Sequence, residues 1–224
     1  RDSINIVSIE QLISYRRRTE RLAEKTGTAQ LPTRYGDFKI HGFVGRYDPD
    51  QHVALVLGQW EPGEPVMVRV HSQCFTGDIF GSLRCDCGSQ VDQSLKAIAS
   101  EGKGVFLYMR QEGRGIGLHN KIRAYQLQDT GLDTVEANAE LGFEPDLRNY
   151  GIGAQILSDL GVKKIRLLTN NPQKIVGLSG FDLEVVERIP IPGEITDENI
   201  DYLRAKKQKL GHLINTNDDP QAPD

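Results

Sequence analysis

The chain has little of several features, and each shortage excludes a class of protein. Among its 224 residues there are only three cysteines, and all of them lie between Cys74 and Cys87, so a disulfide framework is not expected. No apolar run exceeds five residues, whereas a membrane-spanning helix needs about 20. No basic stretch followed by an apolar one opens the sequence, so no secretory signal is expected.

The chain also lacks an excess of positive charge. It has 27 basic and 31 acidic side chains, a formal net charge of −4, and 7% aromatic residues. Nucleic-acid binding without sequence preference depends on neutralising phosphates, so no nucleic-acid partner is expected. With 38% hydrophobic and 26% charged residues the composition is globular, which predicts a cytoplasmic protein of one ordinary or two small domains with no membrane partner.

Three regions are predicted along the chain. Ser8 to Lys25 has apolar residues on one helical face, and Gly27 to Pro32 then interrupts the pattern. We therefore predict an N-terminal helix and interdomain linker over residues 1–27 and a main domain over residues 28–214. The polar, proline-containing residues 215–224 are predicted to be a disordered tail.

The pattern of the main domain predicts a mixed α/β fold. Short apolar strands punctuated by glycine and proline come first, and strands alternate with helices in the C-terminal two thirds, which favours a partly parallel sheet. The predicted strands include Phe38–Gly42, Val53–Leu57, Val66–Val70, Val105–Met109, Ile165–Thr169 and Leu183–Glu187. The predicted helices are Ser89–Ser100, Leu118–Gln128, Val135–Leu141, Ile152–Leu160, Lys174–Leu178 and Asn199–Leu210.

The cysteines form the motif Cys74-x10-Cys85-Asp-Cys87, which is typical of metal ligation. Zinc binds thiolates readily, and three protein ligands with one open position characterise a catalytic site. A capping box of Ser89 and Asp92 would begin the next helix and place its positive end near the thiolates. Two alternatives stay open: a closed structural site completed by His71, and three cysteines buried as small hydrophobic residues.

Two loops that follow strands predict anion binding. Arg110-Gln-Glu-Gly-Arg-Gly-Ile-Gly117 combines glycines with arginines that could clamp phosphates, and Glu112 could accept the N–H edge of a guanine. Leu167-Leu-Thr-Asn-Asn-Pro-Gln-Lys174 places Lys174 in the first turn of a helix, where phosphate is favoured. Each could instead be an ordinary surface turn or strand-to-helix connection.

Together these segments resemble GTP cyclohydrolase II, from about Leu31 to Leu213. Four motifs in order carry the resemblance: Arg69-Val-His-Ser-Gln-Cys-Phe-Thr-Gly-Asp78, Ser82-Leu-Arg-Cys-Asp-Cys-Gly88, Arg110-Gln-Glu-Gly-Arg114 and Leu167-Leu-Thr-Asn-Asn-Pro172. The resemblance implies zinc-dependent hydrolysis of GTP to 2,5-diamino-6-ribosylamino-4(3H)-pyrimidinone 5′-phosphate, formate and pyrophosphate, the first step of riboflavin biosynthesis.

The resemblance also implies a role for individual residues. Cys74, Cys85 and Cys87 would hold one zinc ion, Tyr125 would orient or polarise the attack on C8 of the guanine, and Arg148 would engage the α-phosphate with Asp146 as its base. The residues implied to line the GTP are Arg69, Val70, His71, Ser72, Gln73, Gln90, Glu112, Gly113, Arg114, Thr134, Thr169 and Lys174. Mg²⁺ on the triphosphate and a homodimer are implied as well.

Elementary chemistry qualifies three of these roles. Three thiolates leave Zn²⁺ with a net charge of −1, so its water needs a neighbour such as Tyr125 to become acidic enough. A guanidinium stays protonated, so Arg148 is a nucleophile only if an extended backbone puts Asp146 on the same side, and otherwise a clamp for the phosphate. Gln73 replaces a glutamate that is usual in the family, so no acid–base role is expected of that side chain.

The opening segment Ser8-Ile-Glu-Gln-Leu-Ile-Ser-Tyr-Arg-Arg-Arg18 resembles the stretch that joins the halves of bifunctional riboflavin proteins. We therefore expect an N-terminal fusion to a 3,4-dihydroxy-2-butanone 4-phosphate synthase. Two other functions stay open. One is a zinc-stabilised nucleotide- or RNA-binding module without hydrolase activity, and the other is a variant that stops before deformylation or acts on another purine nucleotide.

Overall fold

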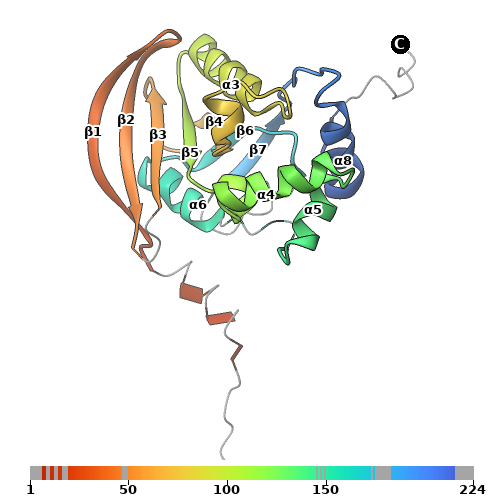
Figure 1. The fold of residues 1–224 in the computed structure, drawn as a ribbon. Coiled ribbons are helices and arrows are strands. Elements are labelled where there is room, and N and C mark those ends of the chain that lie inside the picture. Colours follow the sequence, from red (N-terminus) through yellow and green to blue (C-terminus); the bar gives the residue numbers. More distant parts are fainter. Residues whose placement is uncertain are drawn as a thin grey trace, which may run out of the picture.

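The structure is a computed structural model. It describes residues 7–8, 11–12, 15–16, 20–46, 50–144, 146, 148, 150–172, 174 and 183–214. Seven strands form one sheet in the order β1-β2-β3-β5-β4-β6-β7 (Figure 1). The strands are β1 (Ala23–Thr33), β2 (Gly36–Gly45), β3 (Gln51–Leu57), β4 (Pro65–Ser72), β5 (Gly104–Met109), β6 (Lys164–Leu168) and β7 (Glu184–Ile189).

The helices lie on both faces and at one end of this sheet (Figure 1). They are α2 (Phe75–Asp78), α3 (Cys87–Glu101), the 3-10 helix η1 (Glu112–Gly115), α4 (Leu118–Asp129), α5 (Thr134–Glu140), α6 (Tyr150–Asp159) and α8 (Ile200–Leu210). Within the described residues, none of the helices has the length and apolar character needed to span a bilayer.

The sheet has an antiparallel half and a parallel half, which confirms the predicted mixed α/β fold. Strands β1, β2, β3 and β5 pair antiparallel in that order, whereas β5, β4, β6 and β7 pair parallel. The parallel strands β4 and β5 are buried along nearly their whole length, as expected for strands covered on both faces.

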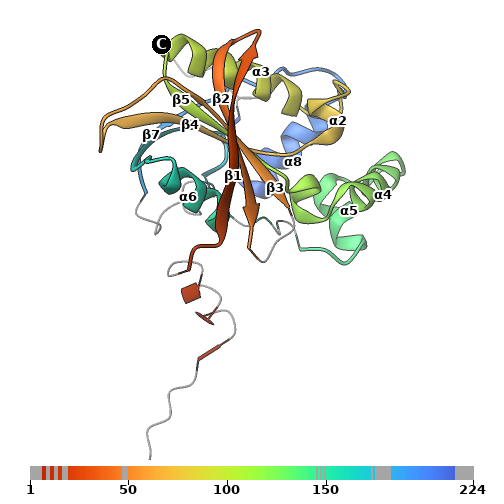
Figure 2. The ribbon, with the colours of Figure 1, turned by 90° about the vertical axis from the view of Figure 1, so that its left-hand side faces the viewer.

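Two apolar cores lie on opposite faces of the sheet. Val68 and Leu107 point to the face covered by α6, where Ile156 is fully buried. Their neighbours in the strands point the other way, to the face where Ile98 of α3 is fully buried. Figure 2, seen from the β1 edge, shows α3 above the sheet and α6 below it. Packing on both faces holds the central strands in place, and the loops of the site start from the ends of these strands.

The sequence prediction was wrong at the N-terminal side of the domain. Residues 23–33 form strand β1, so the expected helix does not extend to Lys25, and Gly27 to Pro32 is not a linker. The boundary predicted between residues 27 and 28 therefore falls inside a strand. Most of β1 is exposed, because it is an edge strand held mainly by its ladder to β2, so it shows no clear apolar alternation. The tail at 215–224 and most of the helix predicted over 174–178 lie outside the described residues.

Three of the predicted site segments follow the carboxyl ends of parallel strands. Cys74 follows β4, Glu112 follows β5, and Thr169 follows β6. Because these strands are parallel neighbours, their carboxyl ends lie at one edge of the sheet, where α/β proteins bind ligands. Helices α4, α5 and α8 gather beyond this edge (Figure 1).

Candidate active site

A single cavity at this edge of the sheet contains nearly all of the predicted site residues. The open space between its walls, including the mouth, is about 1060 Å³. Its walls come from loops after three strands, from α4 and from the C-terminal segment around α8. A cavity lined by convergent polar groups is typical of a small-molecule site.

The three cysteines meet at one wall of the cavity. Their sulfur atoms all lie within 4.8 Å of one another, and the sulfurs of Cys74 and Cys85 are 3.6 Å apart. Among the described residues, this is the only group of three or more possible histidine, cysteine or carboxylate ligands. Sulfurs so close together are a suitable donor set for zinc.

Two glycines allow this close approach. A Cβ atom on Gly77 would lie 2.9 Å from the sulfur of Cys85 and 3.1 Å from that of Cys74. A Cβ on Gly88 would lie 2.5 Å from the carbonyl oxygen of Gly77. Helix α2 therefore packs against the start of α3 only because both positions lack a side chain, and this contact brings Cys74 to Cys85 and Cys87.

Helix α3 begins differently from the prediction. Its N-cap is Asp86 and its first residue is Cys87, so the predicted capping box of Ser89 and Asp92 is wrong. The Ser89 hydroxyl instead donates to the carbonyl oxygen of Asp86 at 3.0 Å, and Asp92 accepts from Tyr35 at 2.8 Å. The positive end of the helix consequently lies at the cysteine cluster itself.

Lys121 of α4 balances the negative charge of the cluster. Its ammonium is 3.1 Å from the sulfur of Cys74 and 2.7 Å from Oε1 of Glu112. A hydrogen bond from Cys85 lowers the pKa of the Cys74 thiol, and the same contact raises the pKa of Cys85 to about 11. Burial alone would lower the pKa of Lys121, but the Cys74 thiolate and Glu112 together raise it.

Tyr125 lies one turn further along α4 and faces the cavity. Its hydroxyl is 3.1 Å from the hydroxyl of Thr76, and Arg84 lies over its ring at 4.9 Å. Ile122, three residues earlier on the same helix, is 52% exposed, so Tyr125 does not belong to an apolar core face. The face of α4 toward the protein carries Lys121 and Ala124 instead.

Glu112 is held in place from three sides. Besides Lys121, the amide of Phe75 donates to its Oε2 at 2.7 Å and the amide of Gly113 to its Oε1 at 3.2 Å. The following Arg114 has a left-handed backbone with φ 61°, an uncommon conformation for a residue with a side chain. Its Nη1 is buried without a partner in the described part of the chain, so the loop directs a cation into the protein.

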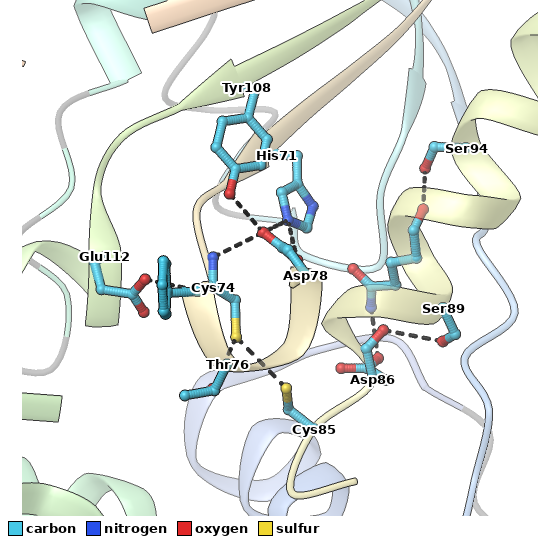
Figure 3. A network of polar contacts seen from close by, with 12 residues as sticks. His71, Cys74, Thr76, Asp78, Cys85, Asp86, Ser89, Ser94, Tyr108 and Glu112 are labelled. Atoms are coloured by element: carbon cyan, nitrogen blue, oxygen red, sulfur yellow. Dashed lines mark hydrogen bonds and ion pairs between the residues drawn. The ribbon is translucent and has the colours of Figure 1, made fainter. Parts of the chain in front are cut away.

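His71 is not part of the cysteine cluster. Its Nε2 is 3.1 Å from both carboxylate oxygens of Asp78, and Oδ2 of Asp78 also accepts from the hydroxyl of Tyr108 and the amide of Cys74 (Figure 3). Burial lowers the pKa of His71. The histidine therefore fixes Asp78, which in turn fixes the start of α2, and the closed site predicted as an alternative is not formed with His71.

A buried polar chain runs from the cysteine loop to the other end of the cavity. Lys206 of α8 contacts Asp86 at 2.9 Å, and Gln90 donates to the same carboxylate at 2.5 Å. Arg69 in turn donates to Gln90 at 2.5 Å and to the carbonyl oxygen of Leu168 at 2.9 Å. Burial lowers the pKa of Arg69 to about 10.

Lys174 and Arg148 add two more cations at this end. Lys174 is 6% exposed and donates to the carbonyl oxygen of Val70 at 2.9 Å. Burial, reinforced by Arg69 and Arg148, lowers the pKa of Lys174 well below its usual value. Arg148 forms a two-pronged ion pair with Asp146, at 2.8 and 2.5 Å.

The cavity thus has two ends of different chemistry. We call the first the thiolate end; it contains Cys74, Cys85, Cys87, Glu112, Lys121 and Tyr125. We call the second the cation end; it contains Arg69, Arg114, Arg148, Lys174 and Lys206. Of the residues predicted to form the site, Val70 and Asp146 alone do not line the cavity, and each contacts a residue that does.

Sequence reasoning missed several cavity residues. Lys121, Arg84, Lys206 and His212 were not predicted, although all four line the cavity. Lys121 had a usable signal, because it precedes Tyr125 by four residues on a helix and must share its face. Lys206 had none, since its partner Asp86 lies 120 residues away in the chain.

This chain is similar to one known protein family and to proteins of one biosynthetic route. The family model described as GTP cyclohydrolase II matches residues 24–190. The chain is 59% identical over 212 residues to the riboflavin biosynthesis protein RibBA of Bacillus cereus, and equally to that of Bacillus mycoides. Each alignment covers 95% of this chain and 53% of the relative, so the chain spans about half the length of the curated relatives it matches.

A solved structure is also similar. It is RibBX, a two domain 3,4-dihydroxy-2-butanone 4-phosphate synthase from A. baumannii, with a TM-score of 0.48 and 23% identity over 82% of this chain and 44% of that one. The family match covers three quarters of the sequence and includes all three cysteines. The chain belongs to the GTP cyclohydrolase II family.

Proposed function

We propose that the chain hydrolyses GTP to 2,5-diamino-6-ribosylamino-4(3H)-pyrimidinone 5′-phosphate, formate and pyrophosphate. This is the reaction that opens riboflavin biosynthesis. The observation that carries the proposal is the cavity with two ends: a thiolate cluster suited to a metal at one end, and buried cations suited to a polyphosphate at the other. A purine nucleoside triphosphate presents its base and its phosphates to two such ends at once.

Cys74, Cys85 and Cys87 would hold the zinc ion. The cradle left by Gly77 and the absence of His71 from the cluster fit an ion with three protein ligands. Zinc in such a site acts as a Lewis acid that activates water for hydrolysis. Three thiolates would leave the zinc site with a net negative charge. The ammonium of Lys121, next to the sulfur of Cys74, offsets part of this charge.

Glu112 and Tyr125 would act on the base. Glu112 is rigidly held by Lys121 and the amide of Phe75, and its carboxylate can accept the N–H edge of a guanine. Burial raises the pKa of Tyr125, so its hydroxyl keeps its proton at neutral pH and can donate it in a hydrogen bond. We infer that Tyr125 orients the attack at C8 rather than serving as a base.

At the cation end we favour Arg148 as an electrostatic clamp. Burial raises the pKa of Asp146, but the hydrogen bonds and charge of Arg148 outweigh it and lower that pKa overall. A carboxylate of low pKa is a poor base for a guanidinium, whose own pKa is above about 12. Arg69, Lys174 and Lys206 would share the phosphates with Arg148, and Mg²⁺ would accompany the triphosphate.

The arrangement of the arginine loop favours this function over an RNA-binding module. Glu112 is 8% exposed and Nη1 of Arg114 is buried, so these two side chains line the cavity, and of the two arginines in the loop only Arg110 is exposed. A homodimer is a further proposal. So is an N-terminal 3,4-dihydroxy-2-butanone 4-phosphate synthase, which would account for the half of the curated relatives that this chain does not cover.

The test is metal analysis combined with product identification. Purified protein should contain about one zinc per chain and release formate and pyrophosphate from GTP. Cys85→Ser should lose the metal and slow turnover on the order of 10³-fold. Ser82→Ala, on the same loop, is the control and should leave both unchanged. Zinc-loaded protein that leaves GTP intact would refute the proposal.

A further inference from the structure

The segment after α8 places a histidine over the cation end. Helix α8 ends at Gly211, which has a left-handed backbone with φ 66° and donates to the carbonyl oxygen of Lys206. The amide of His212 donates to the same carbonyl at 3.1 Å, and the amide of Leu213 donates to the carbonyl of Asn170 at 2.8 Å. Hydrogen bonds on both sides therefore fix the backbone of His212 next to the loop that follows β6.

The side chain of His212 lines the cavity and has no local hydrogen-bond partner. Among the described residues, neither ring nitrogen accepts or donates a hydrogen bond. The charged groups of the same cavity that act most strongly on it are Lys206 of α8, Lys174 after β6, Arg114 from η1 and Arg148 before α6. No carboxylate is among these groups.

Such surroundings keep the imidazole uncharged until an anion arrives. Burial, and then the four cations, lower the pKa of His212 to about 3. A polyanion placed among those cations reverses the local field and favours the protonated ring. The ring can then donate a charge-assisted hydrogen bond to a phosphate oxygen.

We propose that His212 is a phosphate-binding residue of this site, donating a ring N–H to the polyphosphate of the substrate. The proposal deepens the proposed function and rests on it for the identity of the nucleotide. His212 lies outside residues 24–190, the part matched by the family model. If His212 binds the phosphates, the C-terminal segment contacts the substrate directly and does not only form a wall of the cavity.

The first measurement uses the zinc-loaded full chain and inorganic triphosphate as the probe. Calorimetric titration at about pH 5, in two buffers of different ionisation enthalpy, gives the number of protons taken up on binding. Wild-type protein should take up nearly one proton more than His212→Gln, and the variant should bind about tenfold more weakly.

The second measurement is GTP turnover by the same proteins. His212→Gln should raise KM about tenfold and leave kcat within about twofold, because it removes a contact made before and during the reaction. His119→Gln is the matched control, since His119 lies on α4 and does not line the cavity. Thermal unfolding of both variants confirms that they are folded.

The outcomes separate the two proposals. Equal affinity and equal proton uptake in wild type and His212→Gln would overturn the role of His212 even if GTP is hydrolysed. Failure of the wild-type protein to bind triphosphate would overturn that role as well. The predicted difference in binding, with no turnover of GTP by wild type, would support His212 as a phosphate ligand and overturn the proposed function.

Discussion

The thiolate end and the cation end differ in how their buried charges are balanced. At the thiolate end, Lys121 contacts both a sulfur and a carboxylate, so each buried charge has an opposite charge beside it. At the cation end, Arg69, Arg114 and Lys174 form no ion pair with a carboxylate in the described part of the chain. Removing one partner at the first end should therefore cost stability, whereas the second end is itself costly until an anion binds.

This difference predicts opposite effects for two buried lysines. Lys121→Met should destabilise the protein by about 3 kcal/mol, because it leaves Glu112 buried without its cation. Chemical denaturation measures the change in the free energy of unfolding. The double variant Lys121→Met with Glu112→Gln should recover part of the loss, and a single variant as stable as wild type would contradict the account of the thiolate end.

Tyr125→Phe tests the same end through catalysis. The substitution removes the hydroxyl that contacts Thr76 but keeps the ring under Arg84, so the fold should be unchanged. We expect kcat for GTP to fall about 10²-fold and KM to stay within about twofold, as for a group that acts in the transition state. Steady-state release of formate measures both constants, and an unchanged kcat would exclude Tyr125 from the chemical step.

Lys174→Met should stabilise the free protein by about 1 to 2 kcal/mol while weakening the binding of GTP. The pKa of Lys174 is lower in the folded than in the unfolded protein, so the unfolded state binds more protons below pH 10.5. The variant's advantage should accordingly be greatest at neutral pH and below, and vanish as the pH rises toward 10.5. Thermal unfolding at several pH values measures it, and an advantage that grew with pH would contradict a lowered pKa for Lys174.

The smallest effect is expected outside the cavity, at Lys209. This residue pairs with Asp133 and Glu136 of α5, but its side chain is 39% exposed. Lys209→Met should lower the free energy of unfolding only slightly and leave KM for GTP unchanged. It is the matched control for the buried lysines, and a large effect on KM would show that the docking of α8, rather than its cavity residues, controls binding.

The sequence predicted much of the fold because the relevant signals are local. Apolar runs identified the strands from β2 to β6, and the positions of the glycine- and proline-rich turns placed the helices between them. Strand β1 was mistaken for a helix and a linker because it is polar, exposed and held by backbone pairing, which leaves little periodicity to detect. The same limitation explains the wrong cap of α3, where the packing of Gly77 against Gly88 decided the start of the helix.

The candidate site was predictable to the extent that its residues lie in short motifs. The cysteines and the two anion-binding loops are of this kind. The charge partners of two cavity lysines are distant in the chain: Lys121 contacts Cys74, 47 residues away, and Lys206 contacts Asp86, 120 residues away. Such contacts arise from the topology of the sheet, which brings the carboxyl ends of β4, β5 and β6 together.

Asp86 lies between two of the cysteines and is bound to the C-terminal helix. The tripeptide Cys85-Asp-Cys87 therefore contacts both ends of the cavity: its sulfur atoms lie at the thiolate end, and its carboxylate contacts Lys206 of the cation end. If the cysteines hold a metal ion as proposed, a change of its geometry would be transmitted through Asp86 to Lys206, and from there to the cation end. On the proposed function, replacing that metal by another should then alter the preference for the leaving group as well, because a single stretch of backbone would serve both ends of the cavity.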